Sequence, residues 1–218
     1  MKRLELKVCG LKEPENINDV VALDPQRIGF IFYAGSPRYV LPTLQPEELK
    51  HISGNTLKTG VFVNQSADEI RSIAERFSLD VLQLHGNESP ELCAELNSFL
   101  PVVKAFGIKA NNNWELISRY EYSCDLFLFD TASASFGGSG KRFNLDELKN
   151  YSGGNPYYIA GGIGFENSYD VVSEIRQLND PRLIGLEVNS AVEVYPGLKN
   201  ISFLTSFINT LNHEQLSR

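Results

Sequence analysis

Two side chains that could move protons stand at the ends of apolar runs. Asp130 follows LFLF, and Cys9 follows LELKV. A carboxyl group at the end of a buried strand is poorly solvated, which favours its protonated form and suits it to general acid catalysis. A second interpretation stays open for each residue, because Asp130 could cap the following loop and Cys9 could be a buried structural thiol.

Glycines and small polar residues follow the last two apolar runs. Gly161 and Gly162 come after YYIA, and Asn189, Ser190 and Ala191 come after LIGLEV. Glycine lets the backbone approach a ligand closely, and backbone N–H groups at such places can hold a phosphate. The pattern favours a phosphate site, although ordinary turns would also use these residues.

Two further polar side chains end or follow apolar runs. Arg38 lies in FYAGSPRYV, and His85 precedes Gly86. An arginine can bind a carboxylate through two parallel hydrogen bonds, and a histidine can bond a ligand. A surface arginine and a histidine that caps a helix are the alternatives.

A glycine-rich loop follows Asp130. It contains Gly137, Gly138 and Gly140 before Lys141, and it lacks the spacing of a nucleotide-binding P-loop. Such a loop could close over a ligand or remain a solvated turn.

Eight short apolar runs, rich in Val, Ile, Leu and Phe, must position these residues. Near-continuous apolarity predicts strands covered on both faces, as in a parallel sheet. The predicted strands are residues 4–9, 28–33, 57–63, 81–85, 102–108, 126–130, 157–162 and 183–188.

Helical patterns separate the runs. Ser66 with Glu69 forms a capping box, Ser89 with Pro90 begins a second helix, and residues 166–178 and 201–211 show helical spacing. Eight strand–helix units predict a single-domain (β/α)₈ TIM barrel over residues 1–218, with an open doubly wound sheet as the alternative. The candidate residues then fall at the carboxyl ends of the strands, where such barrels place their active sites.

Composition limits the classes of partner. The chain has 218 residues, 42% of them hydrophobic, and a net charge of −7. An acidic chain without a basic cluster argues against nucleic acid. No apolar run is long enough to span a membrane, and the three scattered cysteines and three histidines lack metal-site spacing. We therefore expect a reduced, cytoplasmic protein with no metal.

Several motifs occur together in a recognisable order: KVCG, GFIFYAGSPRYV, GVFVN, LQLHGNESPELC, VVKAFGI, LFDTASASFGGSGKRFN, IAGGI and EVNSAVEVYPGLKN. This ordered set resembles the phosphoribosylanthranilate isomerase family over about residues 6–200. The family is a (β/α)₈ barrel that catalyses the third step from chorismate to tryptophan, an Amadori rearrangement that uses no cofactor. The resemblance therefore implies a phosphorylated small-molecule substrate. It leaves open whether the chain is a monomer or a homodimer.

The resemblance also implies roles for individual residues. Cys9 would be the general base and Asp130 the general acid. Arg38 would face the carboxylate of the anthranilate group. The stretches from Gly161 to Gly162 and from Asn189 to Ala191 would bind the phosphate, and His85 would contact the substrate.

Strand periodicity adds Lys7 to the candidate site. Lys7 and Cys9 are two residues apart and so share one face of the first strand. In a closed barrel the last strand adjoins the first, so Glu187 could pair with Lys7. We expect Lys7 to favour the thiolate of Cys9, and Glu187 to hold Lys7. A purely structural ion pair is the alternative.

The last strand departs from the family pattern, which is close to DVSSGVE. Here the segment reads EVNSAVE, so Glu187, Asn189 and Ala191 replace Asp, Ser and Gly. We expect phosphate binding to persist if Ala191 keeps a negative φ angle, because the backbone donors then remain.

Three other functions remain open from the residues. The chain could be another cofactor-free sugar-phosphate isomerase or epimerase, a non-catalytic barrel, or a dual-substrate isomerase that also serves histidine biosynthesis. The last would need a second phosphate site opposite the first.

Overall fold

The computed structural model describes residues 4–52, 54–109, 112–131 and 144–216, with side chains to residue 213. Eight parallel strands in these ranges form a closed barrel in chain order, β1 to β8. The strands are β1 (Glu5–Val8), β2 (Arg27–Ile31), β3 (Leu57–Phe62), β4 (Val81–Leu84), β5 (Val102–Ile108), β6 (Leu126–Thr131), β7 (Tyr157–Ile159) and β8 (Leu183–Val188). The barrel prediction is confirmed, and the open sheet is excluded because β8 pairs with β1.

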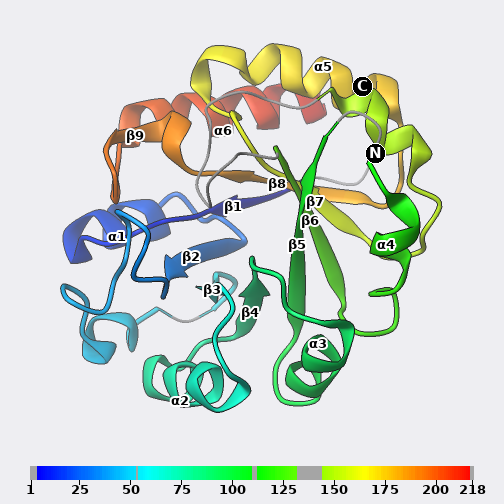
Figure 1. The fold of residues 1–218 in the computed structure, drawn as a ribbon. Coiled ribbons are helices and arrows are strands. Elements are labelled where there is room, and N and C mark those ends of the chain that lie inside the picture. The colour runs from blue at the N-terminus through cyan, green and yellow to red at the C-terminus, as the bar shows by residue number, and fades with distance from the viewer. Residues whose placement is uncertain (1–3, 53, 110–111, 132–143, 217–218) are drawn as a thin grey trace.

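Helices surround the strands on the outside (Figure 1). They are α1 (Pro14–Val21), α2 (Ala67–Phe77), α3 (Pro90–Asn97), α4 (Trp114–Ser118), α5 (Ser168–Leu178) and α6 (Ile201–Leu216). The described residues after β2 and β6 instead carry short 3₁₀ helices, η1 (Pro46–Leu49) and η2 (Leu145–Asn150). Two strand–helix units therefore depart from the regular repeat, and the other strands are followed by α-helices.

Local sequence signals set where two of these helices begin. The side chain of Ser66 accepts a hydrogen bond from the backbone N–H of Glu69, and the Glu69 carboxylate accepts one from Ser66, as the capping box predicts. Ser89 caps α3, and Pro90 is its first residue. Each cap satisfies backbone donors that the helix cannot pair itself.

The chain packs around two separate apolar clusters. The larger lies between the barrel and its helices. The smaller fills the barrel interior and consists of Val81, Val103, Ala105, Leu126, Leu128, Tyr158 and Ala160. These interior residues come from β4 to β7 and, for Ala160, from the position just after β7, whereas β1 and β8 contribute the buried charged residues Lys7 and Glu187. The interior is therefore polar on one side, next to Cys9.

The end of the chain adds two elements to this pattern. A 3₁₀ helix, η4 (Ser190–Val192), follows β8, and an antiparallel hairpin of β9 (Glu193–Tyr195) and β10 (Leu198–Lys199) comes before α6. A further 3₁₀ helix, η3 (Phe165–Asn167), precedes α5. Both 3₁₀ helices lie next to the predicted phosphate loops. None of the helices in the described ranges has the length and apolar character needed to cross a bilayer.

Candidate active site

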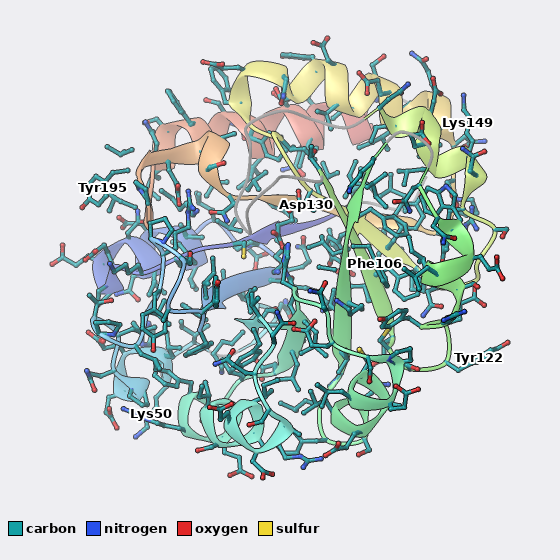
Figure 2. All side chains as sticks on the ribbon, viewed as in Figure 1. Lys50, Phe106, Tyr122, Asp130, Lys149 and Tyr195 are labelled. Carbon is teal, nitrogen blue, oxygen red and sulfur yellow. The ribbon has the colours of Figure 1, made fainter. Side chains whose placement is uncertain are left out.

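One cleft collects most of the predicted site residues at the carboxyl ends of the strands. It has a volume of about 800 Å³, counted to its open mouth. Figure 2 shows Asp130 in the middle of the barrel, with Lys50, Tyr122, Lys149 and Tyr195 at the periphery of the molecule. The predicted residues that line the cleft are Cys9, Arg38, His85, Asp130, Gly161, Gly162, Asn189, Ser190 and Ala191.

Lys7 lies beneath the cleft and does not line it. Its side chain is buried, and its ammonium group lies 2.6 Å from Oε2 of Glu187. It also donates a hydrogen bond to Oε1 of Gln83. The predicted pairing of Lys7 with Glu187 is therefore confirmed, in register with the β1–β8 ladder.

Cys9 is buried at the end of β1. Gly29 on β2 leaves room for it, since a Cβ atom there would come within 2.7 Å of the thiol sulfur. Burial, followed by the negative charge of Glu187, raises the pKa of Cys9 to about 11. Lys7 and Lys199 lower the pKa, as expected for cations, but they do not outweigh the first two effects. In the ligand-free protein Cys9 is therefore a thiol near neutral pH.

Asp130 and His85 face each other across the cleft. Nε2 of His85 lies 3.6 Å from Oδ2 of Asp130, and both side chains are about a quarter exposed, at 27% and 20%. On its other side, Nδ1 of His85 lies 3.0 Å from Nε2 of Gln83. His85 thus bridges the carboxyl group and the buried polar interior.

Arg38 is held at the mouth of the cleft by Glu193. Its Nε and Nη2 atoms donate hydrogen bonds of 2.8 and 2.5 Å to the two carboxylate oxygens. Lys199 donates to the same carboxylate at 2.7 Å and to Oδ1 of Asn189 at 2.9 Å. The arginine therefore belongs to a network that reaches the loop after β8.

The two predicted phosphate loops line the same side of the cleft. Gly161 and Gly162 have φ angles of +92° and +62°, which side chains rarely adopt. Ala191 belongs to η4 and is absent from the described non-glycine residues with positive φ. Because Asn189 uses its oxygen to accept from Lys199, its amide N–H groups stay available as donors.

Ala191 is accommodated by a glycine opposite it. A Cβ atom on Gly164 would lie 2.6 Å from the Cβ atom of Ala191. The methyl group that departs from the family pattern therefore occupies space that Gly164 leaves empty.

Three polar residues of the site did not emerge from the sequence. Gln83 stands two residues before His85 and so shares its strand face, a signal that could have identified it. Glu193 and Lys199 lie within the quoted motif EVNSAVEVYPGLKN, but no spacing rule connects them to Arg38.

The glycine-rich loop with Gly137, Gly138, Gly140 and Lys141 lies outside the described residues. Within the described ranges, no group of three or more His, Cys, Asp or Glu side chains is placed to hold a metal ion.

Comparison with known proteins identifies a family. Residues 6–210 match the family model described as N-(5'-phosphoribosyl)anthranilate (PRA) isomerase. A relative from Parabacteroides distasonis, named N-(5'-phosphoribosyl)anthranilate isomerase, is 43% identical over 212 residues, which cover 95% of this chain and 93% of the relative.

Solved structures agree with the sequence relatives. The crystal structure of phosphoribosyl anthranilate isomerase from Thermus thermophilus has a TM-score of 0.83 and 28% identity, covering 96% of this chain and 99% of that one. A phosphoribosyl anthranilate isomerase in complex with reduced 1-(o-carboxyphenylamino)-1-deoxyribulose 5-phosphate has a TM-score of 0.74 and 25% identity, with the same coverage.

Proposed function

The chain belongs to the N-(5'-phosphoribosyl)anthranilate isomerase family, and on this premise we propose that Cys9 and Asp130 perform the two proton transfers of its reaction. The protein converts N-(5'-phosphoribosyl)anthranilate to 1-(2-carboxyphenylamino)-1-deoxyribulose 5-phosphate, the third step from chorismate to tryptophan. The observation that carries the residue roles is that a thiol from β1 and a carboxyl group from β6 line one cleft.

Asp130 is the general acid in this proposal. Its proton goes to the ring oxygen of the ribosylamine, the bond between C1 and that oxygen breaks, and the nitrogen lone pair forms a C=N bond. The location of Asp130 at the cleft surface, with His85 opposite, supports this role. A positioned proton donor contributes on the order of 10²–10⁴-fold in rate.

Cys9 is the general base. Its thiolate removes the proton on C2, which the adjacent iminium acidifies, and the electrons of that bond form an enolamine. The enolamine becomes the ketone when C1 gains a proton and the C2 hydroxyl loses one. Proton transfers alone balance the rearrangement, so the chemistry needs no redox cofactor.

The thiolate forms in the substrate complex rather than in the empty cleft. Without a ligand, the pKa of Cys9 is about 11. The positive charge of the iminium intermediate beside the sulfur favours the thiolate when the base is needed.

The two ends of the substrate bind different residues of the cleft. Arg38 takes the aromatic carboxylate, while the loop with Gly161 and Gly162 and the segment from Asn189 to Ala191 take the phosphate. The positive φ angles of the two glycines, which shape a loop open to a ligand, support the second assignment. Lys7 acts beneath the substrate, through Cys9.

The remaining expectations are part of the same proposal. The protein acts in the cytoplasm as a monomer or homodimer, without nucleic acid or a membrane as partner. The three buried cysteines form no disulfide, which fits a reducing compartment, and the net charge of −7 disfavours binding to the phosphate backbone of a nucleic acid. Light scattering of the purified protein would determine the oligomeric state.

The test is turnover of phosphoribosylanthranilate made in situ from anthranilate and phosphoribosyl pyrophosphate. Substrate fluorescence should decay rapidly with the wild-type protein. Cys9→Ala and Asp130→Asn should each slow the decay by on the order of 10²–10⁴-fold.

Matched controls lie outside the cleft. Cys93→Ala removes a buried thiol from α3, and Asp125→Asn neutralises an exposed carboxylate just before β6. Both should keep near wild-type turnover. Full activity of either cleft variant would contradict the role assigned to that residue.

A further inference from the structure

A chain of polar side chains, of which all but Lys7 line the cleft, crosses the barrel. It runs from Glu187 on β8 to Lys7 on β1, then to Gln83 and His85 at the end of β4, and finally to Asp130 on β6. Gln83 is 1% exposed and sits at the centre of this chain. The reaction as described above assigns it no role.

The hydrogen-bond partners fix the orientation of the Gln83 amide. Lys7 is salt-bridged to Glu187 at 2.6 Å, and an ammonium group can only donate. The atom of Gln83 that faces Lys7 must therefore be the carbonyl oxygen. The amide NH₂ group then faces His85, and its nitrogen lies 3.0 Å from Nδ1.

The orientation of the amide in turn determines the state of the imidazole. An NH₂ group donates, so Nδ1 of His85 must accept and carries no proton. A neutral histidine then has its proton on Nε2, which is the atom 3.6 Å from Asp130. If His85 were a doubly protonated imidazolium, its Nδ1–H would face the NH₂ group of Gln83. If the Gln83 amide were rotated by half a turn, its NH₂ group would face the ammonium group of Lys7. Both alternatives leave two donors face to face in a partly buried site.

We propose that Gln83 is a positioning residue that holds His85 as the neutral tautomer with its proton on Nε2, directed at Asp130. After Asp130 has given up its proton, a small approach from the present 3.6 Å lets the Nε2–H group donate to the resulting carboxylate. A hydrogen bond to the charged form of an acid favours that form and so assists the proton transfer. The Glu187–Lys7 pair thereby acts on the acid side of the cleft through Gln83.

The purpose assigned to the tautomer rests on the proposed role of Asp130, but the tautomer itself can be measured without substrate. The experiment is NMR of protein labelled with ¹⁵N at its histidines, because the two ring nitrogens have separate shifts when protonated and unprotonated. His85→Asn identifies the His85 signals. His51, which contacts Asn18 on the outside of the barrel, serves as an internal reference.

Wild-type His85 should show a protonated Nε2 and an unprotonated Nδ1. In Gln83→Glu the donor becomes an acceptor, so Nδ1 should become protonated while the His51 signals stay unchanged. Gln26→Glu makes the same chemical change at the amino-terminal end of β2, and should leave His85 unchanged. A protonated Nδ1 in wild type, or unchanged His85 shifts in Gln83→Glu, would overturn the proposal.

A second variant covers the case in which Gln83→Glu does not fold. Gln83→Met keeps the length of the side chain and removes both the donor and the acceptor. The Nδ1–H tautomer should then appear in His85 at a measurable population. Retention of the pure Nε2–H tautomer would show that Gln83 does not set it.

Kinetics test whether the tautomer matters for turnover. Gln83→Glu should lower kcat by roughly 10- to 100-fold, less than loss of a proton-transfer partner itself. In a His85→Asn background the same change should have little further effect, because Gln83 acts through His85. If the kcat losses of Gln83→Glu and His85→Asn multiplied in the double variant, the proposal would be overturned. A wild-type protein without turnover would instead contradict the proposed function and leave the NMR result intact.

Discussion

Glu193 binds Arg38 side-on, through Nε and Nη2, and no described residue forms a hydrogen bond with Nη1. The pairing raises the pKa of Arg38, chiefly through the hydrogen bonds to Glu193. Burial raises the pKa of Glu193, but the hydrogen bond from Arg38 and the charge of Lys199 outweigh burial and hold it below its ordinary value. The carboxylate therefore stays charged and fixes one edge of the guanidinium while the other edge can receive a ligand.

Glu193→Gln should weaken the hold on Arg38 and misplace its free edge. We expect KM for phosphoribosylanthranilate to rise about tenfold, which corresponds to about 1.4 kcal/mol. Initial rates with an analogue that lacks the aromatic carboxylate provide the control, because Glu193→Gln should not change the KM for that analogue. An equal rise in KM with both substrates would show that the substitution disturbs the loop as a whole rather than Arg38 alone.

The thiol of Cys9 should titrate far above neutral pH. Since its pKa is about 11, alkylation of Cys9 by iodoacetamide should reach half its maximal rate near pH 11, whereas a thiol with the ordinary pKa of 9.0 reaches half its maximal rate near pH 9.0. The modified peptide is quantified by mass spectrometry, and circular dichroism verifies that the protein remains folded at each pH.

Two substitutions beneath the thiol should move its pKa in opposite directions. Glu187→Gln removes a negative charge that raises the pKa of Cys9, so its alkylation profile should shift to lower pH. Lys7→Met removes a charge that lowers the pKa, so its profile should shift to higher pH. Unshifted profiles in both variants would show that the ion pair is only structural.

Lys104 and Glu88 hold the loop that carries His85. The pair is 3.1 Å apart with side chains 2% and 0% exposed, and Glu88 also accepts from the backbone N–H of Gly86. Removing one partner of a buried pair leaves an uncompensated charge, so Lys104→Met should lower the free energy of unfolding by about 3–5 kcal/mol in urea titrations.

Two controls separate this effect from general sensitivity. Lys149→Met breaks an exposed pair with Asp146 and should change stability little. Lys104→Met combined with Glu88→Gln removes both charges and should recover part of the loss. A double variant as unstable as the sum of its single changes would contradict the charge explanation.

Gly164 should be intolerant of a side chain because of Ala191. Gly164→Ala would bring its Cβ atom within 2.6 Å of the Ala191 methyl group and 2.8 Å of the Ala191 carbonyl oxygen. We expect the displaced loop to raise the inhibition constant for inorganic phosphate by about tenfold, or about 1.4 kcal/mol.

Ala191→Gly restores the family residue and removes one of the two clashes. Added to Gly164→Ala, it should recover phosphate inhibition in part, because the backbone oxygen still obstructs the new methyl group. Unchanged inhibition in Gly164→Ala would separate this loop contact from phosphate binding.

Much of the barrel follows from local sequence. The apolar runs predicted all eight strands to within a few residues, since strands buried on both faces must be apolar. The caps at Ser66 and Ser89 were equally visible because they join residues only three apart. The 3₁₀ helices after β2 and β6 were not predicted, because short segments are shaped by their packing more than by their own preferences.

In the candidate site, too, some contacts were predicted from the sequence and others required the structure. Strand period and barrel closure together led from Lys7 to Glu187, because each of these rules is general to the fold. The links from Arg38 to Glu193 and from Gln83 to His85 and Lys7 needed the actual side-chain positions.

By itself, the sequence determined where the strands lie along the chain, which residues of a strand share a face and the motifs that identify the family. Only the tertiary structure decided which charges meet, and with what effect on Cys9: its thiol ended beside Glu187 as well as Lys7, and its pKa rose. The physical reason is that apolar periodicity acts over a few residues, whereas the state of a buried ionisable group depends on burial and on every charge that folding brings within a few ångströms.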